Sequence, residues 1–200
     1  LRTIMGLWRA SAGAVRYDGR DITRTPTPDV ARLGIAYVPE NMGIFAGLTV
    51  QENLRLAARA GEPEAKRLEW IFGLFPAIKT FWSALAGNLS GGQKQMLAVA
   101  RAIVEPRRLL LVDEPTKGLA PAIIANMVEA FRELKRTDTT ILVVEQNAAM
   151  ALELAEAGAA VADLDEQVLA LLSRHGMSLC CGRNDELRVG RTSLPLAGRD

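Results

Sequence analysis

Two adjacent carboxylates, Asp113 and Glu114, stand at the end of an apolar run in the stretch LLLVDEP, residues 109–115. The apolar run predicts a strand that is buried on both faces. Ionised carboxylates lose hydration when they are buried, so a pair at the end of such a strand indicates a specific partner. In phosphoryl transfer, Asp113 would hold Mg²⁺ through water, while Glu114 would orient and polarise an attacking water. The alternative is an acid that merely caps the next helix.

A second candidate site is the segment LSGGQKQ, residues 89–95. Ser90 is a favourable helix N-cap, and Gly91 and Gly92 allow the backbone to approach a partner closely. The free N–H groups in the first turn of the following helix form a potential anion site. Taken by itself, the segment could equally be a glycine-rich cap that binds nothing.

The composition limits the class of protein. A chain of 200 residues with 49% hydrophobic content predicts one globular domain or a large part of one. A net charge of +1 gives no electrostatic footprint for nucleic acid. The only cysteines, Cys180 and Cys181, are adjacent, which fits neither a zinc site nor a disulfide framework and favours a reducing, cytosolic setting. No apolar run approaches the roughly 20 residues that span a bilayer.

The elements that must position these residues alternate between helices and apolar strands. We expect strands at residues 35–38, 109–112 and 140–144, and helices at 50–60, 64–75, 94–104, 122–135 and from about 148. This alternation predicts a parallel sheet that is covered on both faces. A hairpin around Asp18 and Gly19 and the helical stretch at 50–89 are expected as insertions. Functional groups in such sheets lie at the carboxyl ends of strands, where Asp113 and Glu114 fall.

The order of these motifs resembles that of the ATP-binding subunits of ABC transporters. LSGGQ resembles the family's signature, LLLVDE its Walker B strand, TKGLAP (116–121) the loop between subunits, and LVVEQN (142–147) its switch region. YVPENMGIFAGLTVQENL (37–54) resembles the segment that joins the core to the helical subdomain. These segments are most similar to those of the import ATPases for branched-chain amino acids. Glu40 stands where the family usually has its coupling glutamine, and Gln146 where it usually has its switch histidine.

The resemblance covers roughly residues 1–155 and implies an α/β fold. The expected architecture is a parallel sheet core of the P-loop NTPase type, with an inserted helical subdomain at about 50–104 and a small antiparallel β portion. Residues 156–200 do not follow the family pattern. We expect a divergent C-terminal segment there, with a helical DEQVLALL stretch at 165–172 and disorder at 183–200.

The resemblance also implies an ATPase that works in pairs, with each ATP held between one subunit's phosphate loop and the other's signature. Ser90, Gly91, Gly92 and Gln93 would then contact the nucleotide bound by the partner. Glu114 would be the general base, Asp113 the partner of Mg²⁺, and Gln146 the sensor of the γ-phosphate. The Gln146 amide donates a hydrogen bond but cannot take up a proton as an imidazole does.

Glu40 has two possible roles. Because its carboxylate accepts hydrogen bonds, it suits a metal-bound water or a basic group on a membrane partner. The alternative is an acid in a solvated loop.

The function implied is ATP hydrolysis by a subunit of a membrane importer, with branched-chain amino acids as the cargo. Its partners would be a second ABC ATPase subunit, transmembrane permease subunits and, indirectly, a periplasmic solute-binding protein, with no nucleic acid. It would lie on the cytoplasmic face of the plasma membrane. One alternative is an ABC-type ATPase that remodels nucleic acid or ribosomes, which a near-neutral single cassette disfavours. The other is a non-catalytic remnant.

The family's glycine-rich loop, which ends in Gly-Lys-Ser/Thr and cradles phosphates, has no counterpart in these residues. We therefore expect the sequence to begin downstream of that loop, with the helical pattern LRTIMGL, ended by Gly6, just after it. An ATPase that works without the loop would need other residues to bind the triphosphate, and the sequence offers none.

Overall fold

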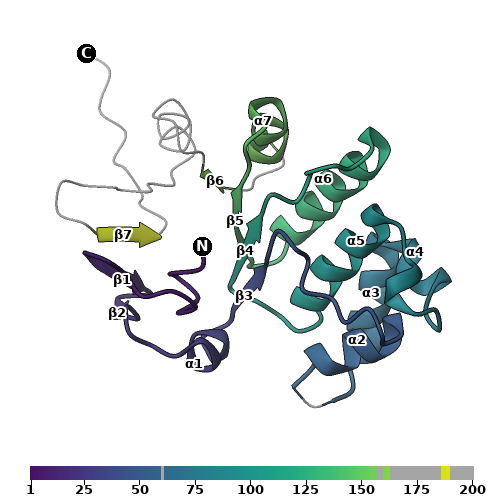
Figure 1. Cartoon of the computed structure of the whole chain (residues 1–200), viewed down its shortest axis with the longest axis horizontal. Coiled ribbons are helices and arrows are strands. Elements are labelled where there is room, and N and C mark those ends of the chain that lie inside the picture. Colours follow the sequence, from purple (N-terminus) through teal and green to yellow (C-terminus); the bar gives the residue numbers. More distant parts are fainter. Residues whose placement is uncertain (60, 157–159, 163–185, 190–200) are drawn as a thin grey trace.

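A parallel four-stranded sheet forms the centre of the molecule (Figure 1). The computed structural model describes residues 1–59, 61–156, 160–162 and 186–189. The strand order is β3 (Ile35–Val38), β4 (Leu109–Asp113), β5 (Thr140–Val144) and β6 (Ala160–Ala162). Val38 pairs with Val112, and Val112 pairs with Val143, so β3, β4 and β5 end at the same level. The predicted α/β fold and its parallel sheet are confirmed.

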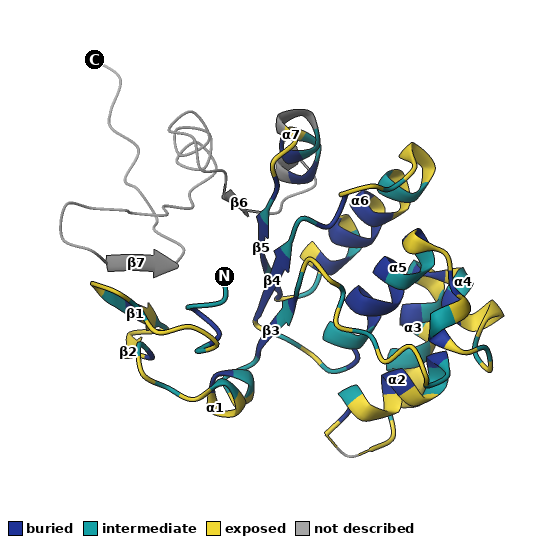
Figure 2. Cartoon of the chain, viewed as in Figure 1, coloured by how far each residue is buried: buried dark blue, intermediate teal, exposed yellow. Residues whose placement is uncertain are grey.

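The two faces of the sheet are buried in two different hydrophobic clusters, as their apolar sequences require. Successive side chains of a strand point to opposite faces. Leu110 and Val112 of β4 therefore belong to the cluster under the helices, while Leu109 and Leu111 belong to the cluster under the N-terminal turns and the hairpin. Residues 109–112 of β4 are buried throughout, as Figure 2 shows for the centre of the molecule.

Most of the helices lie on one side of this sheet, where several of them form a lobe (Figure 1). The helices are α1 (Thr27–Arg32), α2 (Val50–Ala57), α3 (Ala65–Leu74), α4 (Pro76–Thr80), α5 (Gly91–Ala102), α6 (Pro121–Lys135) and α7 (Ala148–Glu156), with a 3-10 turn at Ala86–Asn88. The lobe of α2, α3, α4 and α5 shares one continuous core with the sheet. Leu54, Phe75 and Ile78 of the lobe lie in the same cluster as Leu110 and Val112.

A small second sheet adjoins the N-terminal turns. β1 (Ala14–Tyr17) and β2 (Arg20–Asp21) form the predicted antiparallel hairpin. Its turn residues, Asp18 and Gly19, both have positive φ, of 50° and 75°, which matches the twist of a two-residue hairpin. β7 (Glu186–Val189) pairs with β1 in parallel. This strand lies within the tail for which the sequence predicted disorder; the rest of 183–200, and the DEQVLALL stretch, lie outside the described residues.

Several element boundaries differ from the sequence predictions. α5 begins at Gly91 instead of residue 94, because Ser90 caps it. α1 and α4 were not predicted, although each has a proline in its first turn, where the missing N–H costs nothing. Residues 1–7 form hydrogen-bonded turns instead of an assigned helix. They end as a helix does: the Gly6 N–H donates to the Thr3 carbonyl and the Leu7 N–H to the Arg2 carbonyl.

One buried side chain fixes the segment that leads from β3 into the lobe. The Asn53 side chain is fully buried, and its Oδ1 accepts the Phe45 N–H at 2.9 Å. Its Nδ2 donates to the carbonyls of Phe45 and Thr49, both at 2.9 Å. A single amide thus satisfies backbone groups that would otherwise be buried without partners.

We predict that Asn53→Leu lowers the free energy of unfolding by about 2–4 kcal/mol, because it leaves buried backbone groups unsatisfied at a cost of roughly 1–3 kcal/mol each. Urea unfolding followed by circular dichroism measures the loss. The matched control is Gln51→Ala on the same helix, which we expect to stay within about 0.5 kcal/mol of the original protein. Equal stability of the two variants would contradict this role of Asn53.

Candidate functional site

The carboxyl ends of β3, β4 and β5 bring most of the predicted site residues to one edge of the sheet. Glu40 follows β3, Asp113 ends β4 with Glu114 after it, and Gln146 follows β5. These strands end at the same level, so residues up to 106 positions apart in sequence (40 to 146) become neighbours. The structure therefore joins four of the eight predicted residues into one acidic cluster.

Glu114 is held by its backbone and at both carboxylate oxygens. Its φ is 47°, a left-handed conformation that is uncommon for a residue with a side chain, and its N–H donates to the Val144 carbonyl at 2.8 Å. Gln146 Nε2 donates to Oε1 of Glu114, so the residue predicted as the base and the residue predicted to sense the γ-phosphate are in contact. The Glu114 side chain is only 12% exposed.

Lys117 joins two of these acids, and sequence reasoning missed it. Its Nζ lies 2.6 Å from Glu40 Oε1 and 3.0 Å from Glu114 Oε2. The hydrogen bonds to Glu40 and Glu114 raise the pKa of Lys117 above its usual value. Lys117 in turn holds the pKa of the Glu40 carboxyl below its ordinary range. The one sequence signal was a lysine three positions after a candidate base; its reach to Glu40 depends on the tertiary structure.

Asp113 has a different partner. The Tyr37 hydroxyl donates to Asp113 Oδ2 at 2.9 Å. Burial raises the pKa of the Tyr37 hydroxyl, so it keeps the proton that it donates. This bond orients the Asp113 carboxylate without neutralising it. Oxygen donors of this type suit Mg²⁺, which takes one or two protein carboxylates together with water and substrate phosphates. Among the described residues no group of three or more His, Cys, Asp or Glu could hold a metal alone.

A second buried contact ties the loop after β4 to the end of β5. The Thr116 hydroxyl donates to Glu145 Oε2 at 2.7 Å, and both side chains are buried. The adjacent Lys117 contacts Glu40, which follows β3, and Glu114, which follows β4. The loop is therefore fixed to these strand ends by consecutive residues. Sequence analysis did not identify this contact either.

The other four predicted residues lie at the start of α5, where their polar groups serve the helix. The Gln93 N–H donates to Ser90 Oγ at 3.3 Å, and the Ser90 N–H donates to Gln93 Oε1 at 2.9 Å. This capping box satisfies two of the free donors. Gly91 is exposed, with open space where a Cβ would stand, whereas Gly92 is buried against Ile123 of α6. None of the contacts described here links this group to the acidic cluster.

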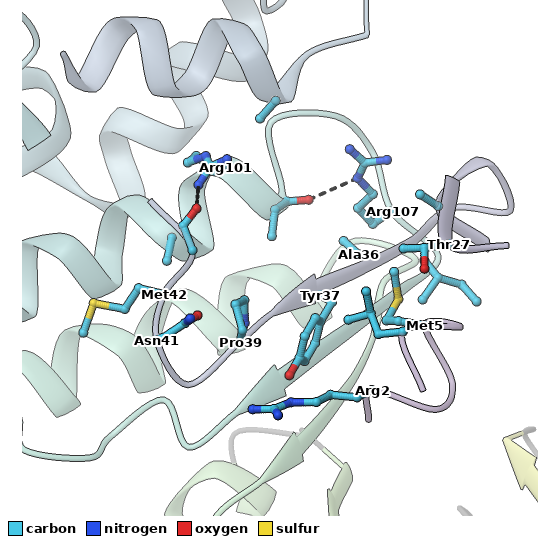
Figure 3. Close-up of a pocket in the computed structure, with 17 residues that line it drawn as sticks. Arg2, Met5, Thr27, Ala36, Tyr37, Pro39, Asn41, Met42, Arg101 and Arg107 are labelled. Carbon is cyan, nitrogen blue, oxygen red and sulfur yellow. Dashed lines mark hydrogen bonds between the residues drawn. The ribbon is translucent and has the colours of Figure 1, made fainter. Parts of the chain in front are cut away.

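A groove runs between the sheet and the lobe, beside the Glu40 loop (Figure 3). Its volume is about 580 Å³, and Arg2, Arg101 and Arg107 line it without any Asp or Glu. Arg101 donates to the Gly43 carbonyl and lies 4.8 Å from the centre of the Phe45 ring. The Arg101 Nε is buried and has no hydrogen-bond partner in the described part of the chain. The groove is therefore positively charged and retains an unused donor.

The sequence is similar to that of known transporter ATPases. The family model described as "ABC transporter" matches residues 1–117. The high-affinity branched-chain amino acid transport ATP-binding protein BraG of Pseudomonas aeruginosa is 39% identical over 78% of this chain and 68% of its own length. The probable branched-chain amino acid transport ATP-binding protein LivF of Archaeoglobus fulgidus is also 39% identical, over 78% of this chain and 67% of its own length. The chain thus spans about two thirds of the length of these relatives.

Solved structures show the same fold. The ADP conformation of an ATP-binding cassette of an ABC transporter superposes with a TM-score of 0.62 at 23% identity, over 76% of this chain and 66% of that one. A dimeric bacterial ABC transporter cassette gives a TM-score of 0.66 at 22% identity, over 76% of this chain and 70% of that one. No described helix is long and apolar enough to cross a bilayer.

We predict that Gly92→Ala is less stable than Gly91→Ala by about 1–3 kcal/mol, because overpacking carries that cost. A Cβ at position 92 would lie 2.8 Å from Ile123 Cγ2, whereas at position 91 it would meet nothing within 4 Å. Urea unfolding of both variants gives the difference. The double variant Gly92→Ala, Ile123→Ala should recover part of the loss relative to Ile123→Ala alone; additive effects would show that the contact is not the cause.

Proposed function

This chain belongs to the ABC transporter family of ATP-binding domains, and on that premise we propose that it is the ATP-hydrolysing subunit of an importer for branched-chain amino acids. The observation that carries the proposal is the contact of Glu114 with Gln146 at the edge where Asp113 also lies. The importer assignment rests on the two relatives that are 39% identical and are named for branched-chain amino acid transport.

In the proposed mechanism Glu114 is the general base. A base of this kind must accept a proton from water that is already oriented for attack. The left-handed backbone at Glu114 and its hydrogen bond to the Val144 carbonyl direct the side chain across the end of β5 toward Gln146. Gln146 donates an amide hydrogen, so it can hold Glu114, or later the γ-phosphate, without exchanging a proton. Proton transfer is thereby assigned to one residue.

Asp113 would hold Mg²⁺, which supplies charge neutralisation on the phosphates when bound. Tyr37 fixes the Asp113 carboxylate by its hydrogen bond, and the oxygen donor fits a hard cation. Glu40 would accept hydrogen bonds from metal-bound water or from a basic group of a membrane partner. In both roles the acids act as ionised oxygen donors.

Ser90, Gly91, Gly92 and Gln93 would bind the phosphates of ATP held by a second ABC ATPase subunit. The start of α5 offers free N–H groups, and the exposed Gly91 lets a phosphate approach the backbone. The separation of this group from the acidic cluster in one chain supports such a shared site, because one subunit then supplies the amides and its partner the acids. The similarity to a dimeric cassette gives this arrangement a fold-level precedent.

The proposed location is the cytoplasmic face of the plasma membrane, against transmembrane permease subunits that receive cargo from a periplasmic solute-binding protein. We assign the permease contact to the arginine-lined groove, where a segment carrying a carboxylate would meet Arg2 and Arg101. An ABC-type ATPase acting on nucleic acid or ribosomes is the competing function, and the net charge of +1 disfavours it.

We predict that Glu114→Gln in the full-length protein retains ATP binding and loses at least about 100-fold in kcat, since general bases contribute roughly 10²–10⁴-fold. Phosphate release and ATP binding, measured side by side, separate the two effects. The matched control is Glu129→Gln, an exposed acid paired with Arg132 on α6, which should leave both values unchanged. Normal turnover by Glu114→Gln would remove this residue from the role of base.

For the groove, we predict that Arg101→Ala reduces co-purification with the permease subunits at least about tenfold, because truncating one partner of a buried charged pair costs 2–5 kcal/mol. Arg132→Ala, an exposed arginine on α6, is the control. Equal thermal midpoints of the variants would show that the fold is kept. Undiminished co-purification of Arg101→Ala would place the permease contact elsewhere.

A further inference from the structure

Lys117 lies between Glu40 and Glu114, two acids to which the proposed mechanism gives separate roles. Its ammonium contacts Glu40 at 2.6 Å and Glu114 at 3.0 Å, and Glu114 already accepts from Gln146 at its other oxygen. Both oxygens of the proposed base are therefore engaged by donors from the protein itself. Each oxygen keeps one further lone pair, so an attacking water would share the carboxylate with these two donors.

We propose that Lys117 is a positioning residue that holds Glu114 in a non-reactive state until the loop carrying Glu40 moves. This inference rests on the proposed function of Glu114 as the base. In this role Lys117 acts on two carboxylates of the chain itself. The three residues Glu40, Lys117 and Glu114 are called the latch below.

The position of Glu40 gives the latch a control point. Glu40 lies two residues after the end of β3, at the start of the segment that leads into the lobe, and that segment is fixed to α2 by Asn53. The Glu40 side chain is 43% exposed and that of Lys117 60%, so both have room to move. The Glu114 side chain is only 12% exposed and therefore has little room to move. A shift of the lobe would therefore move Glu40, and Lys117 with it, away from a fixed Glu114.

The backbone after β4 allows this movement. Gly118 has a φ of 69°, and a Cβ there would meet nothing within 4 Å, so the turn beside Lys117 is unobstructed. Thr116, on the other side, is pinned to the buried Glu145. The lysine side chain can therefore swing while the start of its loop stays in place. The latch opens through a side-chain movement and requires no unfolding of the strand end.

The decisive variant is Lys117→Met, which removes the charge and keeps much of the length of the side chain. We expect kcat of the full-length protein to rise about two- to fivefold with an unchanged KM for ATP, because exposed ion pairs bias an equilibrium by this amount. Lys117→Arg should restore the original rate, since it can contact both acids. Lys79→Met is the matched control: it removes a lysine paired with Glu69 on the lobe, at 3.7 Å, and should change nothing.

A second measurement tests the contact without hydrolysis. In the 200-residue chain without nucleotide, the carboxyl ¹³C resonance of Glu114, assigned by its loss in Glu114→Gln, should shift in Lys117→Met and return in Lys117→Arg. Lys79→Met should leave it unchanged.

An unchanged or lower kcat in Lys117→Met would overturn the latch, since Lys117 would then be neutral or would assist the reaction. An unchanged Glu114 resonance would overturn it as well. If the full-length protein hydrolyses no ATP while the resonance shifts as expected, the contact stands and the proposed hydrolytic function is what fails.

Discussion

The common register of three parallel strands is the constraint on which the site depends. β3, β4 and β5 end level because Val38, Val112 and Val143 pair across the sheet, and both faces of these strands are buried. The apolar side chains thus fix the backbone of the strands, and this places the residues just beyond the strand ends close together. Hydrophobic burial thus brings together three acids and one amide that would not attract one another in an unfolded chain.

Several acids lie close together at one edge of the sheet, which costs electrostatic energy. Hydrogen-bond donors from neighbouring residues offset this cost. Asp113 is oriented by the Tyr37 hydroxyl, Glu145 by the Thr116 hydroxyl, and Glu114 by Gln146 and Lys117. Each of these three acids thus has a donor, and Lys117 adds a full positive charge beside Glu114. The cluster is thus positioned but stays anionic, which suits a hydrated Mg²⁺.

The sheet, its strand ends and the hairpin could be predicted, because buried strands and two-residue turns have strong local patterns. The helices α1 and α4, with Pro28 and Pro76 in their first turns, were harder to predict, because they have only 6 and 5 residues and show little helical periodicity. Lys117 could not be found from sequence: its partner Glu40 is 77 residues away, and a long flexible side chain carries no periodic signal. Likewise, the burial of Gly92 against Ile123 depends on how two helices meet.

The continuous core shared by the lobe and the sheet has a mechanical consequence. Phe75 and Ile78 belong to the same cluster as Leu110 and Val112, so apolar contacts join the two parts. A cut in the connecting chain would not release the lobe as a folded fragment, because its apolar side would become exposed. When the lobe rotates, its interdigitated apolar side chains must therefore slide past those of the sheet. Such packing permits small tilts and resists detachment.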